Sequence, residues 1–317
     1  MSKNSSVTTP YAGSRGWEAS PSTAMIIRRI RERAIEFAMF LCALSSIAIT
    51  VGIVGILLFE SWQFFQAVSL LDFLTDTQWT VLFENPRYGI MPLVAGTVVT
   101  SGVALLFALP VGSTIAIYLS EYADPRVREI IKPILELLSG VPTVVFGYFA
   151  FLFVTPLLQV FLPNLPGFNM LSAGLVIGVM IIPYVSSLSE DALRAVPVQI
   201  REGSYAMGAT RLQTAFRVLI PSAFSGIASA YILGFSRAVG ETMVVAIAAG
   251  QQPNLTLNPM EGAATITAYI VQVSLGDLPH GTIAYQSIFA AGLTLMVITL
   301  AFNVAGYYLR KRYREIY

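Results

Sequence analysis

The chain has 317 residues, of which 55% are hydrophobic and only 12% are charged, and its formal net charge is +1. Soluble globular chains carry about a quarter charged residues, so this composition argues against a soluble fold. The near-neutral charge provides no basic surface for nucleic acid. One cysteine and one histidine are too few for an intrachain disulfide, for a metal cluster of cysteines or for a metal site built by histidine alone.

The first 34 residues precede the long apolar blocks and form two segments of different character. Residues 1–24 are rich in Ser, Thr, Gly and Pro and cannot bury enough apolar surface to fold, so we expect a flexible cytoplasmic tail. Residues 25–34 interleave apolar side chains with four arginines. This pattern is typical either of an amphipathic segment at a membrane surface or of a plain positive anchor, and both lie on the cytoplasmic side.

Six long apolar blocks follow, in a predicted transmembrane domain that covers residues 35–317. Each block approaches or exceeds the roughly 20 residues that an α-helix needs to cross the hydrocarbon core. The blocks cover residues 35–59, 91–119, 134–161, 171–188, 224–249 and 283–309. The predicted fold is an all-α integral membrane protein with six transmembrane helices.

Lys and Arg residues are distributed unequally between the two sides of this predicted bundle. All but two of the 19 fall before the first block, between the second and third, between the fourth and fifth, or after the sixth. Positive residues are retained in the cytoplasm, so both termini are predicted to be cytoplasmic in a multi-pass plasma membrane protein. The exceptions are Arg87, on the opposite side, and Arg237, inside the fifth block.

Small residues recur at four-residue spacing in two of the blocks. Gly174 and Gly178 lie in the fourth block, and Gly226, Ala230 and Gly234 lie in the fifth. Because such spacing lets helix backbones approach one another, we expect these two helices to pack closely against their neighbours.

The cytoplasmic segment between the fourth and fifth blocks, residues 190–222, is far longer than a tight turn requires. Its middle can form a helix that combines solvated cations with apolar contacts, and such a helix could dock into a groove on a soluble partner. The cations are Arg201, Arg211 and Arg217, and the apolar side chains are Tyr205, Met207, Leu212 and Phe216.

The spacing of Glu202, Gly208 and Pro221 resembles the EAA loop of ABC-importer permeases, in which a short coupling helix inserts into the cytoplasmic ATPase. The resemblance implies that the coupling residues here are Glu202, Gly203, Ala206, Gly208, Ala209 and Pro221. The chain departs from the motif because Gly203 and Ser204 replace its two alanines. An ordinary amphipathic surface helix is the alternative interpretation.

Arg237 and Glu241 are opposite charges four residues apart in the fifth block, a spacing that predicts a shared helix face. Charges within a membrane helix usually face the bundle interior or an aqueous path. One interpretation is an ion pair that only neutralises itself. In the other, Arg237 offers its fork of donors to a tetrahedral oxyanion while Glu241 holds the guanidinium ready or competes for it.

The run RAVGETM at residues 237–243 resembles the signature of phosphate-importer permeases of the PstC type. Residues 139–151, SGVPTVVFGYFAF, and residues 88–101, YGIMPLVAGTVVTS, are similar to other segments of that family. The likeness extends from about Tyr88 to the C-terminus and implies the MetI-like fold and the ATP-driven import of inorganic phosphate. In that family the residues matching Arg237 and Glu241 are implicated in phosphate passage.

The same resemblance implies a set of partner subunits. These are a homologous second permease (PstA type), two copies of an ATPase (PstB type) that binds ATP and Mg²⁺, and an extracytoplasmic phosphate-binding protein (PstS type). The chain has no GxxxxGK[ST] loop that would cradle nucleotide phosphates, so we expect a non-catalytic subunit without a cofactor. The alternatives are an ABC permease for another oxyanion, such as sulfate or molybdate, and a secondary transporter.

Overall fold

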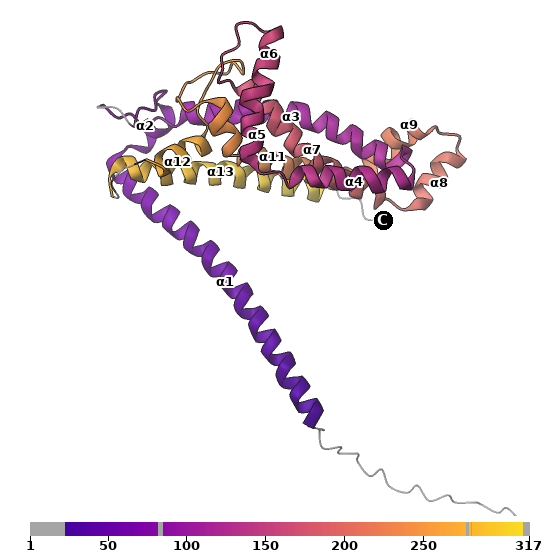
Figure 1. Ribbon diagram of the computed structural model, residues 1–317. Coiled ribbons are helices and arrows are strands. Elements are labelled where there is room, and N and C mark those ends of the chain that lie inside the picture. Colours follow the sequence, from indigo (N-terminus) through magenta and orange to yellow (C-terminus); the bar gives the residue numbers. More distant parts are fainter. Residues whose placement is uncertain (1–22, 82–84, 277–278, 280, 313–317) are drawn as a thin grey trace, which may run out of the picture. The chain divides into compact units, whose positions relative to one another are not determined.

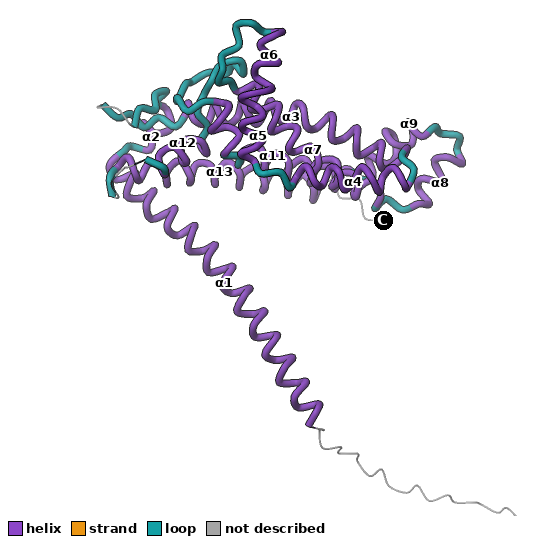
Figure 2. The backbone as a smooth tube through the Cα atoms, in the orientation of Figure 1, coloured by secondary structure: helices purple, strands orange, loops and turns teal. Residues whose placement is uncertain are grey.

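The computed structural model describes residues 23–81, 85–276, 279 and 281–312. Within these ranges the regular structure is helical, apart from one isolated bridge between Trp79 and Tyr88, as Figures 1 and 2 show. The helices are α1 Thr23–Ala67, α2 Leu70–Thr75, α3 Met91–Ile117, α4 Pro125–Ser139, α5 Thr143–Phe149, α6 Thr155–Phe161, α7 Met170–Arg194, α8 Val198–Ala206, α9 Arg211–Thr214, α10 Ile220–Ser222, α11 Phe224–Val239, α12 Ile266–Ser274 and α13 Ile283–Arg312. Wider π-helical turns join some of them, at η1 Tyr118–Tyr122, η2 Ala150–Val154, η3 Ala215–Leu219 and η4 Val245–Ala249.

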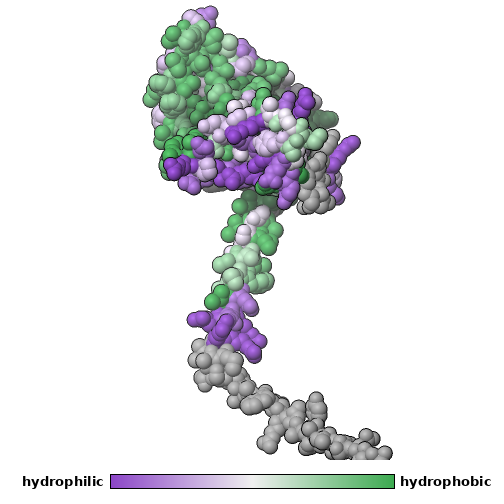
Figure 3. Space-filling view, turned by 90° about the vertical axis from the view of Figure 1, so that its right-hand side faces the viewer, coloured by the Kyte–Doolittle hydropathy of each residue, from purple (hydrophilic) through white to green (hydrophobic). Residues whose placement is uncertain are grey.

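The chain divides into two compact units, Met1–Gly55 and Ile56–Tyr317. All but the last two residues of the expected 1–24 tail lie outside the described residues. The expected surface segment, residues 25–34, forms the start of α1, which continues from it without a break. Arg28 Nε donates to Glu32 Oε1 at 2.8 Å there. Beyond Ile35 the helix exposes apolar side chains on all sides, visible as green surface in Figure 3, which suits a lipid environment.

Within the described ranges, five helical stretches are long and apolar enough to cross a membrane, and a bent pair makes a sixth. The five are Arg31–Ala67, Met91–Tyr122, Thr143–Phe161, Met170–Arg194 and Ile283–Arg312. The bent pair joins Arg211–Ser222 to Phe224–Val239 at an angle of 76°. The predicted all-α membrane bundle is therefore confirmed.

The third predicted span, residues 134–161, needs correction at its start. The structure ends α4 at Ser139 and begins α5 at Thr143, with Gly140 as the α4 C-cap. Pro142, which disfavours helical backbone at the residue before it, stands as the N-cap of α5. The apolar residues of 134–138 belong to one face of an amphipathic helix and were joined to the membrane span only by their proximity in sequence.

The fifth predicted span, residues 224–249, also needs correction because it is not one helix. α11 ends at Val239, Gly240 forms its C-cap, and helix resumes at Met243 before the turn η4. Pro156 and Pro221 explain two of the other wide turns, η2 and η3, which directly precede them. Proline lacks an N–H and its ring displaces the carbonyl four residues earlier, so the helix widens locally there.

α7 lies at the centre of the bundle and packs closely against α3 and α11. A Cβ on Gly174 would lie 2.7 Å from Val103, and one on Gly178 would lie 2.9 Å from the carbonyl oxygen of Ala104. A Cβ on Gly226 of α11 would lie 2.4 Å from the Cβ of Ala192. The small residues therefore provide the close approach that their spacing predicted.

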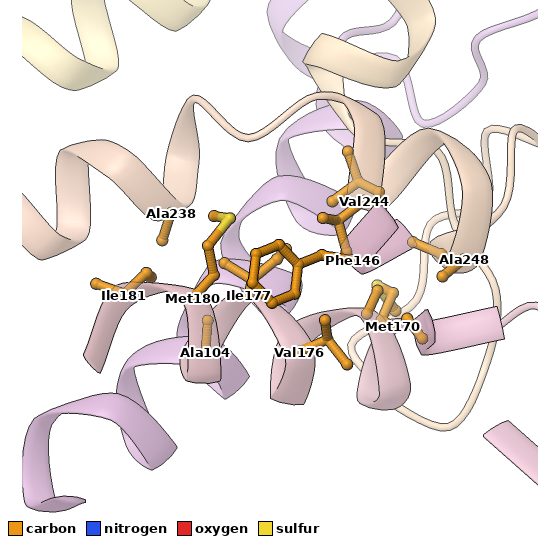
Figure 4. Close-up of a cluster of buried hydrophobic side chains, with 14 of the residues drawn as sticks. Ala104, Phe146, Met170, Val176, Ile177, Met180, Ile181, Ala238, Val244 and Ala248 are labelled. Carbon is orange, nitrogen blue, oxygen red and sulfur yellow. The ribbon is translucent and has the colours of Figure 1, made fainter. Parts of the chain in front are cut away.

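The largest buried cluster fills the space between α3, α5, α7 and the segment after α11. Figure 4 shows Phe146 of α5 pointing into its middle, beside Ile177 and Met180 of α7. The α7 helix begins with a side-chain cap, since Asn169 accepts a hydrogen bond from the backbone N–H of Ser172 at 2.7 Å. This packing fixes α5, α7 and α11 relative to one another and thereby places the residues described below.

Candidate functional site

Arg237 stands in the last turn of α11 with an exposed side chain. The helix from Phe224 to Arg237 measures about 20 Å at 1.5 Å per residue, which is more than half of a hydrocarbon core of about 30 Å. Its guanidinium carbon lies 5.9 Å from the ring centre of Tyr184 on α7, within the range of a cation–π contact. Among the described residues, no carboxylate lies within 4.0 Å of it.

Glu241 is buried, with 4% of its surface exposed, just beyond the end of α11. Its Oε1 accepts hydrogen bonds from the backbone N–H groups of Met243 and Val244 at 3.2 and 3.4 Å. Its own carbonyl accepts a hydrogen bond from Thr267 Oγ1 at 2.6 Å. The carboxylate therefore caps the helical turn that follows it. The first N–H groups of such a turn have no acceptor within the helix, and together with the helix dipole they favour a negative charge.

The predicted shared helix face of Arg237 and Glu241 is wrong. The helix stops at Gly240, so the i,i+4 geometry on which the expectation rested is never formed. Glu241 turns into the core while Arg237 stays at the surface of the chain. Of the two sequence interpretations, the self-neutralising pair has no support here, and the guanidinium is accessible to an anion.

The expected coupling residues fall on a compact group of short helices. Glu202, Gly203 and Ala206 lie on α8, Gly208 and Ala209 lie in the turn after it, and Pro221 is in the first turn of α10. Gly208 has φ +84°, a left-handed conformation that glycine adopts without steric cost. Thr210 and Gln213 then start α9 with a reciprocal capping box. The segment between the helices was expected to begin at residue 190. In the structure it begins after Arg194, because α7 continues to that residue.

α8 and α9 present an exposed mixed surface, which we name the α8–α9 surface. Its apolar members are Tyr205, Met207, Leu212 and Phe216, and its charged members are Glu202, Arg211 and Arg217. Met207 is 88% exposed. Apolar anchors surrounded by charges fit the helix-in-groove mode of recognition.

Arg201, expected in solvent, instead points inward to Glu121 on η1, the π-helical turn that continues α3. Arg201 Nη2 lies 3.0 Å from Glu121 Oε1, and the Glu121 side chain is 2% exposed. Tyr205 donates a hydrogen bond to Glu121 Oε2 at 3.1 Å. Burial, followed by the charge and hydrogen bond of Glu121, raises the pKa of Tyr205. Glu121 thus fastens α8 to the end of α3, a role that no sequence motif indicated.

Glu190, near the C-terminal end of α7, is the second anchoring residue that the sequence did not reveal. Its fully buried carboxylate contacts Arg128 Nε at 2.5 Å and Lys132 Nζ at 3.1 Å, both on α4. Arg194 lies 3.9 Å away, and Lys132 also binds Asp191 at 2.9 Å. Burial lowers the pKa of Lys132, but the hydrogen bonds and charges of these two acids outweigh it and raise the pKa overall.

The three buried carboxylates described above each have a partner: Glu121 and Glu190 contact cations, and Glu241 accepts hydrogen bonds from backbone N–H groups. Within the described ranges, no group of three or more His, Cys, Asp or Glu side chains is placed to hold a metal ion.

Sequence comparison places this geometry in a known family. A model described as binding-protein-dependent transport system inner membrane component matches residues 108–315. The probable ABC transporter permease protein YqgH of Bacillus subtilis is 34% identical over 89% of this chain and 91% of its own length. The phosphate transport system permease protein PstC 1 of Mycobacterium tuberculosis is 35% identical over 74% and 80%. The probable PstC of Methanocaldococcus jannaschii is 30% identical over 92% and 98%.

Solved structures support the fold. A bacterial ABC transporter involved in the import of the acidic polysaccharide alginate aligns with a TM-score of 0.63 and 18% identity, over 90% of this chain and 98% of that chain. The MetNI methionine ABC transporter in an inward-facing conformation aligns with a TM-score of 0.54 and 20% identity, over 72% and 95%. The chain therefore belongs to the family of binding-protein-dependent transport system inner membrane components, the multi-pass permease subunits of ABC transporters.

Proposed function

We propose that this chain is the permease subunit through which an ATP-driven importer passes inorganic phosphate into the cytoplasm. The observation that carries the proposal is Arg237, an exposed guanidinium at the broken end of α11 with no carboxylate beside it among the described residues. Arginine presents a planar fork of donors that matches tetrahedral oxyanions. Relatives at 30–35% identity that carry the name of phosphate permeases support the choice of substrate.

Glu241 takes a different part in this proposal from the one that the sequence suggested. Its carboxylate neither holds nor competes for the guanidinium, because it caps the turn after the break. By fixing that turn, Glu241 sets where α11 ends and hence where Arg237 stands. A single exposed cation beside Tyr184 binds an anion weakly enough for release, which conduction requires.

The α8–α9 surface is the proposed docking site of the ATPase. Motion of α8 would reach α3 through the contacts of Arg201 and Tyr205 with Glu121. It would reach α4 through Glu190 near the end of α7, and α4 leads directly into α5. Both routes connect the coupling helices to helices that pack around the centre of the bundle, so a small displacement at the ATPase is converted into movement of the spans.

The assembly follows from the same proposal. The chain would be non-catalytic and would lie in the plasma membrane of a prokaryote with both termini in the cytoplasm, as its Lys and Arg distribution indicates. Its partners would be a second permease of the PstA type, two ATPase subunits of the PstB type that bind ATP and Mg²⁺, and a phosphate-binding protein of the PstS type outside. The names of the relatives favour phosphate over sulfate or molybdate, and nothing in the described residues favours a secondary transporter.

The test is ATP-dependent phosphate uptake by vesicles that contain the reconstituted complex, with Arg237→Gln compared at matched abundance. Losing a charge-assisted interaction of about 1.5–3 kcal/mol should lower uptake about 10- to 150-fold, and Arg237→Lys should retain an intermediate rate. Arg126→Gln, which removes an exposed charge on α4, is the matched control and should leave uptake unchanged. Full uptake by Arg237→Gln would refute the assignment, and preferred uptake of sulfate or molybdate would refute the substrate.

A further inference from the structure

The cytoplasmic ends of α11 and α13 line an open cavity of about 430 Å³ that the transport proposal does not use. Its lining carries two cations and three hydroxyl groups: Ser225, Gly226 and Ser229 come from α11, and Tyr307, Arg310 and Lys311 come from α13. The volume is within the range of small-molecule sites. Arg310 Nη1 lies 3.5 Å from Ser229 Oγ, so a cation and a hydroxyl converge on one side of the cavity.

The charges in this cavity select an anion. No carboxylate is among its lining residues, and within the described residues neither Arg310 nor Lys311 has an acidic partner within 4.0 Å. Two cations, serine hydroxyls and a phenol together supply donors suited to phosphate oxygens. Basic pockets between transmembrane helices on the cytoplasmic side are a recurrent form of site for lipid head groups.

The exposed face of α13 indicates which kind of phosphate compound the cavity would bind. Val297, Leu300 and Val304 are 55%, 57% and 44% exposed, and their spacing of three and then four residues places them on one helix face. The same spacing continues through Tyr307 to Lys311 in the cavity. An apolar stripe thus leads along α13, the long yellow helix of Figure 1, into the cationic cavity, as an acyl chain leads to its head group.

We propose that this cavity binds the phosphate head group of an anionic phospholipid of the inner leaflet, with an acyl chain along the α13 stripe. The proposal rests on the membrane orientation given above but not on the transported substrate. Tyr307 lies at the junction of stripe and cavity, as expected of an aromatic residue at the membrane interface. Such a lipid would join α13 to α11, the helix that carries Arg237.

Native mass spectrometry of the full chain, purified in detergent with the subunits that copurify with it, tests the proposal. Phosphatidylglycerol and the zwitterionic phosphatidylcholine are titrated in parallel. Each cation near a membrane surface contributes about 1 kcal/mol, or about fivefold, so Arg310→Gln/Lys311→Gln should weaken phosphatidylglycerol binding about 30-fold. The control Arg126→Gln/Arg312→Gln removes two exposed charges outside the cavity lining and should weaken it less than about twofold.

Three outcomes would overturn the proposal. The first is equal loss of phosphatidylglycerol binding in the two double variants, and the second is equal binding of the two lipids to the natural chain. The third is a free-phosphate site: inorganic phosphate alone would then raise the melting temperature of the natural chain more than that of the cavity variant, while phosphatidylglycerol showed no preference for the natural chain. Because no transport is measured, failure here leaves the phosphate-import proposal intact, and failure of Arg237→Gln to reduce uptake leaves the lipid site intact.

Discussion

Substituting Glu190 by glutamine should destabilise the chain through the junction between α7 and α4. The carboxylate is fully buried and contacts two α4 cations, Arg128 Nε at 2.5 Å and Lys132 Nζ at 3.1 Å. Glutamine keeps the shape and one acceptor oxygen but removes the negative charge. Arg128 then remains partly buried without an ionic partner among the described residues, while Lys132 keeps Asp191 at 2.9 Å.

The expected magnitude follows from these contacts. Hydrogen bonds to charged groups contribute about 1.5–3 kcal/mol each, and removing one partner of a fully buried pair costs about 3–5 kcal/mol. Here the Arg128 and Lys132 side chains are 27% and 23% exposed, so water compensates part of the loss. We expect Glu190→Gln to lower the free energy of unfolding by about 2–3 kcal/mol, or the melting temperature by about 3–5 °C.

The assay is thermal unfolding of the purified chain in detergent, with Asp191→Asn as the matched control. Asp191 makes one of the same contacts, but its side chain is 57% exposed, so its loss should cost less than about 1 kcal/mol. Equal shifts for the two variants, or no shift for Glu190→Gln, would show that burial of Glu190 does not make it an anchor. In the transporter, Glu190→Gln should also lower the phosphate imported per ATP hydrolysed, since α4 is then less firmly tied to α7.

Two further predictions concern packing and pH. Gly174→Ala should cost about 1–3 kcal/mol, because its Cβ would lie 2.7 Å from Val103; Gly102→Ala, with nothing within 4 Å, should be neutral or stabilising, and equal melting temperatures would contradict this. The raised pKa of Tyr205 means that its neutral form stabilises the fold below the unfolded-state pKa of about 10 and that this contribution is lost as the pH rises through the folded-state pKa. Ultraviolet titration should therefore show that Tyr205→Phe forms one phenolate fewer than the natural chain above the ordinary tyrosine pKa. An unaltered titration of Tyr205→Phe would refute the raised pKa of Tyr205.

The membrane spans could be predicted from the sequence because each apolar block in a bilayer must be a helix. The boundaries of the spans could not be predicted where apolar residues continued past a break in the helix. Residues 134–138 read as part of a span although they form one face of α4, and 224–249 read as one span although helix stops at Gly240. Hydropathy reports how apolar a segment is, but a break depends on backbone geometry at single residues.

The anchoring roles of Glu121 and Glu190 could not be predicted from the sequence, because their partners are distant along the chain. Glu121 contacts Arg201, and Glu190 contacts Arg128 and Lys132. Only the packing of η1 against α8 and of α4 against α7 brings these pairs together. In the sequence each was one acid among the many charges of the segments predicted to be cytoplasmic. Burial distinguishes them, with side chains 2% and 0% exposed, and burial follows from tertiary structure alone.

The break after α11 determines the surroundings of both Arg237 and Glu241. An uninterrupted helix would have placed Glu241 one turn from Arg237 and neutralised it, leaving no net charge for an anion. Ending α11 at Gly240 instead gives each charge its own environment, Glu241 on backbone N–H groups in the core and Arg237 at the surface. Because α11 also packs on α7 and follows α8, α9 and α10 in the chain, a displacement of α8 and α9 would move the helix that carries the cation. The residue proposed to bind the anion and the segment proposed to receive the ATPase are therefore parts of one continuous stretch of chain.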